Sequence, residues 1–290
     1  MNNPQMSDLQ TSEHPSMMAL DAEAIAQMVA ARREGGLWRT LNDMSIVAWR
    51  NLLLEVRSPA SLLVSTFFTI SLLCVFTASF AKVFSDGGSF SSYAQFLLPF
   101  TIVQGLLFNT VNISNFFFED LDNGMDVRLR AMPIARLAAV GGRFIASGAR
   151  LLFQVVGIVL AGYFLGFRLQ GGIFAAIGFL LLPVIFTLAV AMMGFYVAVG
   201  AKSAEGVAAV LNPWILPLTF LSIGYVPKEG FPNWAQGFVT HNPVSVVSEA
   251  MRALASGDPA LASVSITLGW SALFMVVFGW MTLKAYKHRI

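Results

Sequence analysis

Long stretches without charge divide this sequence. Five long stretches contain no Asp, Glu, Lys or Arg, and they cover residues 58–81, 87–118, 169–201, 206–227 and 259–283. Each stretch is long enough for the ~20 apolar residues with which a helix crosses the hydrocarbon core of a bilayer. A sixth stretch, 151–167, becomes adequate if its helix begins near Phe144 and the Arg150 side chain extends toward the headgroups. The pattern therefore predicts an all-α membrane protein with six transmembrane helices.

We place these helices at about 60–81, 97–118, 144–167, 174–199, 207–226 and 261–283. An even number of spans puts both termini on one side of the membrane. Most Lys and Arg residues near the span ends fall on that same side, which predicts cytoplasmic termini. Prolines inside the fourth and fifth spans predict kinks, and the fifth is a candidate for a pathway-lining helix.

Residues 37–57 show a helical periodicity with apolar side chains mainly on one side. Tryptophans and arginines next to a membrane span favour a helix lying in the headgroup plane. The residues that indicate this are Trp38, Trp49, Arg50 and Arg57. The alternative is an ordinary helix packed on a cytosolic partner. We expect residues 1–36 to form a disordered or weakly helical cytoplasmic tail.

The predicted cytoplasmic loop, residues 119–143, places four acidic residues before four arginines. Leu129 and Met132 lie three apart and share a helical face, and Pro133 would end or start a short helix. A short helix with exposed apolar side chains is a docking element for a second protein. A plain structural turn is the alternative.

The last external loop, residues 226–260, is partly apolar. Phe231, Trp234 and Phe238 form one helical face, and a second apolar face follows Pro243. We expect two short helices that dip part-way into the membrane. An amphipathic lid on the outer surface would differ only in depth.

Amide side chains form a stripe along the second span. They line a polar pathway or make hydrogen bonds between helices, and the second reading is slightly favoured. The residues that we assign to the pathway lining are Gln104, Phe108, Asn109, Asn112 and Asn212.

Composition agrees with a membrane protein, because 56% of the residues are hydrophobic and only 12% are charged. Soluble domains contain about 45–50% apolar and about 25% charged residues. The net charge of +2 is too small to indicate a nucleic-acid binder. The single Cys74 and three scattered histidines form no metal-ligand cluster. The sequence contains no phosphate-binding loop motif, and its spans contain no acidic residue, so any active transport must draw its energy from another polypeptide.

Two local motifs carry a family resemblance. In the cytoplasmic loop, acidic residues precede Gly124, an Arg-Leu pair at 128–129, Pro133, Arg136 and Gly142-Arg143. The external loop carries Pro227, Pro232-x-Trp234, Asn242-Pro243, Arg252 to Leu254 and Gly257. With six predicted spans, the sequence resembles a type-2 ABC transporter permease, and Leu-Gly-Phe-Arg at 165–168 is similar to the daunorubicin-resistance (DrrB/DrrC-like) branch.

The resemblance implies the transmembrane subunit of an ATP-driven exporter in the bacterial plasma membrane, moving an amphiphilic antibiotic or a complex lipid. Two permeases, identical or paralogous, would pair with a dimer of ATP-binding subunits, which would hold ATP and magnesium while this chain holds no cofactor. The first, second and fifth spans would line the pathway, with membrane lipids as further partners. A non-ABC carrier or channel, or a scaffold that recruits a cytosolic partner, is the alternative.

The resemblance also assigns roles to single residues. The residues that would couple to the ATPase are Glu119, Asp120, Gly124, Arg128, Leu129, Met132, Pro133, Arg136 and Arg143. The residues that would form the extracellular gate are Pro227, Phe231, Pro232, Trp234, Asn242, Pro243 and Arg252. No residue is expected to be catalytic or to bind a metal.

Overall fold

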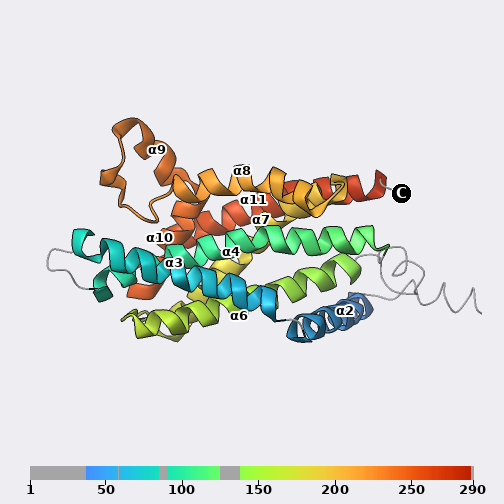
Figure 1. Cartoon of the computed structure of the whole chain (residues 1–290), viewed down its shortest axis with the longest axis horizontal. Helices are drawn as coiled ribbons and strands as arrows, with labels where there is room; N and C mark the ends of the chain where they lie inside the picture. The colour runs from blue at the N-terminus through green and yellow to red at the C-terminus, as the bar shows by residue number, and fades with distance from the viewer. Residues whose placement is uncertain (1–36, 58, 85–89, 125–137, 289–290) are drawn as a thin grey trace, which may run out of the picture.

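The computed structural model describes residues 37–57, 59–84, 90–124 and 138–288, and every regular element in these residues is helical (Figure 1). The long helices run roughly side by side along the longest axis of the molecule. One end holds α2 (Leu37–Arg57) and the C-terminus, and α9 (Asn233–His241) protrudes at the other end. The fold is therefore an elongated bundle with two distinct ends.

Five helices of the described residues are long and apolar enough to cross a membrane. They are α3 (Ala60–Phe84), α4 (Phe90–Asp122), α6 (Ala138–Phe164), α7 (Gly172–Gly200) and α11 (Leu261–His288). All five coincide with predicted spans, although α4 begins seven residues before the expected 97.

The remaining predicted span, the fifth along the chain, falls on α8 (Ala204–Phe220), which has only 17 residues. The expected boundary was 226, but α8 ends soon after Pro217, whose carbonyl accepts the amide of Leu221. Pro213 and Pro217 lie inside the helix and supply no amide hydrogen to it. The existence of a sixth crossing helix stays a prediction.

α4 is the central helix of the bundle. Its most apolar window is 78% buried, compared with 17% for α3 and 11% for α11. It contacts α3, α6, α7, α8 and α10. Small residues bring the neighbours close, because a Cβ atom on Gly105 would meet Thr69 of α3 and one on Gly194 of α7 would meet Ser114. Close approach of this kind supplies the van der Waals contact that holds helices together in lipid.

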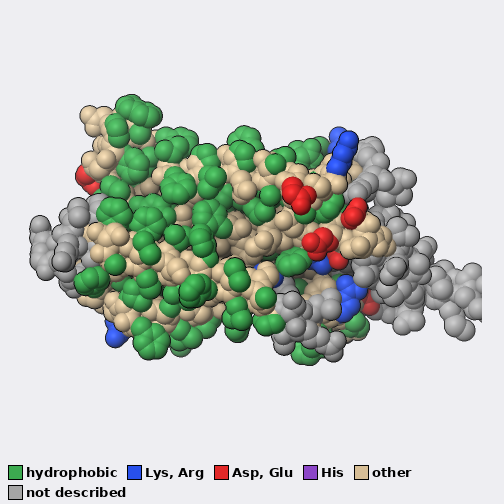
Figure 2. All heavy atoms as spheres, viewed as in Figure 1, with side chains coloured by type: hydrophobic (Ala, Val, Ile, Leu, Met, Phe, Trp, Pro, Cys, Tyr) green, Lys and Arg blue, Asp and Glu red, His purple; other side chains and the backbone are tan. Residues whose placement is uncertain are grey.

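The surface is largely apolar along the length of the bundle (Figure 2). Most of the charged side chains in this view gather at the end that holds α2 and the C-terminus. Large side chains such as Phe67 on α3 and Val276 on α11 are exposed. An uncharged flank of this kind suits lipid or a second membrane subunit better than water.

The predicted external loop contains a single 3-10 turn, η1 (Lys228–Gly230), followed by α9 and α10 (Pro243–Ser256). Pro232 precedes α9, Pro243 is the first residue of α10, and Gly257 ends α10 in the left-handed conformation. α10 packs on α4, α7 and α11, whereas most of α9 is exposed. The depth of these helices in a membrane stays a prediction.

Candidate functional site

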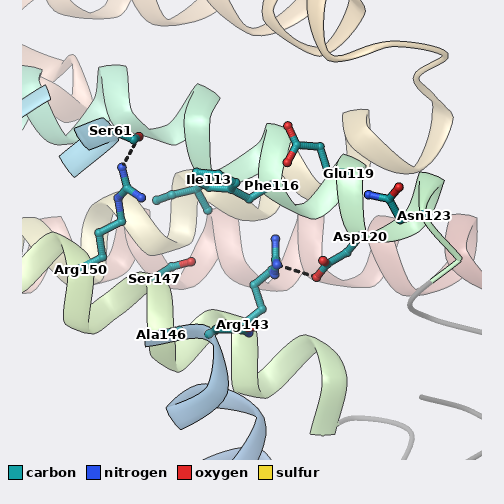
Figure 3. A pocket seen from close by; sticks show the side chains of 11 residues that line it. Ser61, Ile113, Phe116, Glu119, Asp120, Asn123, Arg143, Ala146, Ser147 and Arg150 are labelled. Atoms are coloured by element: carbon teal, nitrogen blue, oxygen red, sulfur yellow. Dashed lines mark hydrogen bonds and ion pairs between the residues drawn. The ribbon is translucent and has the colours of Figure 1, made fainter. Parts of the chain in front are cut away.

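A cavity of about 340 Å³, lined by charged and polar side chains together with apolar surface, lies between α2, α3, α4 and α6 (Figure 3). Its lining includes Glu119 and Asp120 from α4 and Arg143 and Arg150 from α6. Amide and hydroxyl side chains from α2, α3, α6 and the turn after α4 add to the lining, and Ile113, Phe116 and Ala146 contribute apolar surface. The cavity therefore lies where the predicted coupling loop leaves α4 and returns as α6.

An ion pair closes the base of that loop. Arg143 Nη2 lies 2.5 Å from Asp120 Oδ2, joining the last turn of α4 to the second turn of α6. Arg50 of α2 is close enough to act electrostatically on the same carboxylate. Three helices thus converge on one acidic residue.

Two consecutive glycines let α2 reach α6. A Cβ atom on Gly141 would lie 2.7 Å from Met44 Cε, and one on Gly142 would lie 2.6 Å from Val47 Cβ and 2.9 Å from the Met44 carbonyl oxygen. Any side chain at Gly142 would therefore push against the backbone of α2. The two residues of the Gly-Arg motif therefore have different structural roles. Gly142 allows α2 to pack closely on α6, and Arg143 forms an ion pair with Asp120.

The remaining predicted coupling residues divide into two groups. Glu119 is exposed on the last turn of α4, and Gly124 follows that helix with φ +63°, a left-handed conformation that favours glycine. The other group lies outside the described residues: Arg128, Leu129, Met132, Pro133 and Arg136. The docking role of the loop stays a prediction.

α2 occupies the residues expected for the amphipathic helix. Val47 and Ala48 are buried, and α2 packs on α6. Ile46, Trp49 and Leu53 are exposed and follow a helical spacing on the other side. The helix therefore packs on its own chain and keeps a second apolar stripe outside, which suits the predicted headgroup position. Trp38 and Arg57 belong to this helix, but their side chains are not among those described.

The amide stripe of α4 makes hydrogen bonds inside the bundle. Asn112 Nδ2 donates to Asn109 Oδ1 at 3.3 Å, and Asn109 Nδ2 donates to Gln154 Oε1 of α6 at 2.9 Å. One turn before Phe108, Gln104 accepts a hydrogen bond from the Tyr225 hydroxyl at 2.7 Å.

The predicted pathway residues consequently occupy different environments. Gln104 and Asn109 are buried, Phe108 and Asn112 are half-buried, and Asn212 is exposed on α8. Interhelical bonding accounts for the buried amides, while pathway lining stays a prediction. Sequence reasoning did not single out Gln154, although a lone amide in an apolar span signals a polar partner. Nothing in the sequence marks Tyr225 as the partner of Gln104.

Arg252 organises the opposite end of the bundle. Its Nε donates to the Phe96 carbonyl oxygen of α4 at 2.9 Å, and its Nη2 donates to the carbonyl oxygens of Ile223 and Gly224 at 3.1 Å each. The guanidinium carbon lies 3.7 Å from the centroid of the Phe96 ring, a cation–π contact. Burial lowers the pKa of Arg252 to about 10, which keeps the group charged at neutral pH. Arg252 therefore ties α10 to α4 and to the turn after α8.

Asn242 joins the same turn to α10. Its Oδ1 accepts the Val244 amide at 2.9 Å, which caps α10. Its Nδ2 donates to the carbonyl oxygens of Leu218 and Leu221, at 2.9 and 2.7 Å. These carbonyls belong to the end of α8, where helical backbone lacks intrahelical partners. The Asn242 side chain thus forms hydrogen bonds with backbone groups at the end of α8 and at the start of α10.

The other predicted gate residues surround this junction. Pro227 precedes η1 and Phe231 follows it, while Pro232 precedes α9 and Pro243 is the first residue of α10. Trp234 is 86% exposed on α9. The gate role of these residues stays a prediction.

Comparison with known proteins agrees with this arrangement. A family model described as ABC-2 type transporter matches residues 42–255. The chain is 29% identical over 241 residues to the daunorubicin resistance ABC transporter permease protein DrrB1 of Streptomyces coeruleorubidus, covering 83% of this chain and 84% of that protein. It is 33% identical over 154 residues to the probable doxorubicin resistance ABC transporter permease protein DrrC of Mycobacterium tuberculosis, covering 53% and 55%. It is 26% identical over 193 residues to the inner membrane transport permease YadH of Escherichia coli, covering 64% and 72%. The chain therefore belongs to the ABC-2 type transporter family, as a permease similar to DrrB and DrrC.

Proposed function

We propose that this chain moves an amphiphilic drug-like molecule or complex lipid out of the cell, driven by a separate dimer of ATP-binding subunits. The drug-resistance permeases among its relatives support an exporter of such molecules. ATP and magnesium would sit in the partner, and a second permease subunit would complete the pathway. Both termini would lie in the cytoplasm, with α9 and α10 facing outward.

The observation that carries this proposal is the position of α4. Its last turn holds the Asp120–Arg143 ion pair beside the predicted coupling loop, and Phe96 near its first turn binds Arg252 of the predicted gate. α4 is a single helix of 33 residues, about 50 Å long, with Pro99 inside it, so one helix reaches from the loop to the gate. A displacement imposed on the loop by the ATPase would be transmitted along α4.

Nucleotide can drive transport only if the ATPase binds the two states of the permease with different free energies. The loop between α4 and α6 would dock on the ATPase, and closure of the ATPase dimer would move both helices together. The docked loop would then bind the ATPase with a different free energy in each state of the permease. α2 would move with them, because Gly141 and Gly142 hold it against α6. The exposed apolar flanks of α3 and α8 would then offer a path suited to a bulky apolar molecule.

The test is ATPase stimulation in vesicles that contain the permease and its ATP-binding subunit. The double variant Leu129→Asp/Met132→Asp should lose most of the stimulation, because both charges would fall in the docked interface. The control Leu129→Ile/Met132→Leu keeps two apolar side chains and should stimulate normally. Normal stimulation by the Asp variant, with equal membrane insertion, would overturn the docking role.

A further inference from the structure

We propose that the cavity between α2, α3, α4 and α6 binds the zwitterionic headgroup of a phosphatidylethanolamine lipid. This lipid would be a resident ligand of the permease. The proposal concerns neither the cargo nor the ATPase and stands independently of both.

One side of the cavity suits a phosphate group. Arg150 is only 3% exposed, its Nη2 donates to Ser61 Oγ at 2.8 Å, and its guanidinium carbon lies 5.3 Å from the centroid of the Phe116 ring. Ser147 lines the cavity beside it (Figure 3). The planar guanidinium presents forked donors that match phosphate oxygens, and hydroxyls add further donors. This set of groups is therefore a phosphate-binding arrangement.

The other side suits an ammonium group. Glu119 and Asn123 lie together at the end of α4, on the opposite side of the cavity from Arg150. Asp120 is already engaged by Arg143, which pairs with it, and by Arg50, which acts on it electrostatically. The other two charged side chains of the lining, Arg150 and Glu119, have opposite signs. The lining thus offers a partner of opposite sign to each charge of a zwitterion.

The order of these groups along the bundle matches the order of groups in a lipid. Arg150 lies seven residues beyond Arg143 on α6, a rise of about 10 Å toward the middle of the span. Glu119 lies near the end of α4, beside the residue that Arg143 binds. A phospholipid likewise places its phosphate nearer the acyl chains and its ammonium nearer water. Exposed Val64, three residues after Ser61 on α3 and on the same side of the helix, would contact the acyl chains.

Size and chemistry narrow the choice of lipid. A volume of about 340 Å³ admits a headgroup and leaves the acyl chains outside. An anionic phosphatidylglycerol headgroup has no cation for Glu119 and would be repelled by it. A choline headgroup is cationic but has no N–H group to donate to the carboxylate. Phosphatidylethanolamine alone among these three supplies both a phosphate and hydrogen-bonding ammonium protons.

The experiment uses the purified permease without any ATPase. The protein is reconstituted in nanodiscs with equal amounts of phosphatidylethanolamine, phosphatidylglycerol and phosphatidylcholine, and retained lipids are counted by native mass spectrometry. Wild type should retain phosphatidylethanolamine preferentially. Glu119→Gln should lower the ethanolamine-to-glycerol ratio about tenfold, the effect of one hydrogen bond to a charged group. Arg150→Gln should lower retention of all three lipids.

Matched controls separate a site from general surface charge. Lys202→Gln and Glu205→Gln change exposed charges outside the cavity and should keep the wild-type lipid profile. A Glu119→Gln profile equal to that of the controls would overturn the proposal, and so would a wild-type preference for phosphatidylglycerol. Glycerophosphoethanolamine, the headgroup without acyl chains, should not displace the lipid at equal concentration. Full displacement would overturn the assignment of a lipid as the ligand and would indicate a soluble ligand with the same headgroup. None of these outcomes depends on whether the chain exports anything.

Discussion

Arg143 and Arg252 bind opposite ends of α4, and each ties that helix to another segment. Arg143 pairs with the Asp120 carboxylate beside the cavity, and the two side chains are 14% and 31% exposed. Arg252 binds three backbone carbonyl oxygens and covers the Phe96 ring.

The difference lies in what remains when the bond breaks. Asp120 and Arg143 are each partly exposed, so we expect that separating them costs less than separating Arg252 from its three carbonyls. The carbonyls of Phe96, Ile223 and Gly224 point to one guanidinium, and losing it leaves acceptors without that donor. The loop end of α4 is thus the adjustable contact and the α10 end is the fixed one. A helix that transmits motion needs both.

Replacing Arg252 should have the largest effect. We expect Arg252→Gln to lower the free energy of unfolding by about 3 kcal/mol or more, since each buried group left without a partner costs about 1–3 kcal/mol. Arg252→Lys keeps the charge but lacks the planar fork, so it should restore only part of the loss. Thermal or denaturant unfolding in detergent measures both variants. A loss below about 0.5 kcal/mol for Arg252→Gln, the range of ordinary surface substitutions, would contradict the fixed character of this end.

Gly142→Ala should rank second, because it separates α2 from α6. The new Cβ atom would lie 2.9 Å from the Met44 carbonyl oxygen, and overpacking of this kind costs about 1–3 kcal/mol. Gly269→Ala on α11 is the matched control. Apart from the adjoining backbone of α11 itself, no atom lies within 4 Å of its new Cβ, so removing a helical glycine there should be neutral or stabilising by up to about 1 kcal/mol. Unfolding measurements and the emission of Trp49 on α2 report both changes. Equal stability of the two variants would show that α2 is not held closely.

The middle of α4 should give a smaller loss. Asn109→Leu removes the hydrogen bond to Gln154 and the acceptor for Asn112. Hydrogen bonds between membrane helices contribute about 0.6 kcal/mol on average and up to about 1.7 kcal/mol, so we expect a loss near 1 kcal/mol. Asn212→Leu changes an exposed amide on α8 and should leave unfolding unchanged. If Asn212→Leu impaired transport while Asn109→Leu only lowered stability, the two amides would have separate roles. The reverse pattern would contradict the structural role assigned to Asn109.

Sequence periodicity and charge spacing located most of the bundle for a clear reason. A span must avoid charge over its whole length, and that requirement is visible in one dimension. The end of α8 was misplaced by six residues because 221–226 is apolar like a span, yet it forms the turn that Arg252 and Asn242 bind. The early start of α4 was missed because Phe90–Phe96 contains polar residues.

The contacts of the candidate site were harder to foresee. Arg252 was recognised from its motif, but its partners are backbone carbonyls, which have no signature in a sequence. Gly142 was recognised in the same way, yet only the position of Met44 explains why a side chain is excluded there. The Asp120–Arg143 pair had a visible signal in the opposite charges at the two ends of one loop, although several pairings were equally open.

The Asp120–Arg143 pair should give the smallest effect on stability. In a double-mutant cycle of Asp120→Asn and Arg143→Gln, we expect a coupling energy below about 1 kcal/mol that shrinks as salt is added, since partly exposed ion pairs are weak and screened. The same cycle measured by ATPase stimulation should give a larger coupling, because the pair closes the base of the predicted docking loop. Arg252 offers the converse pattern, with a large effect on unfolding that salt leaves unchanged. A strong, salt-independent coupling between Asp120 and Arg143 would mean that both ends of α4 are fixed, and the adjustable contact would then have to lie elsewhere on the helix.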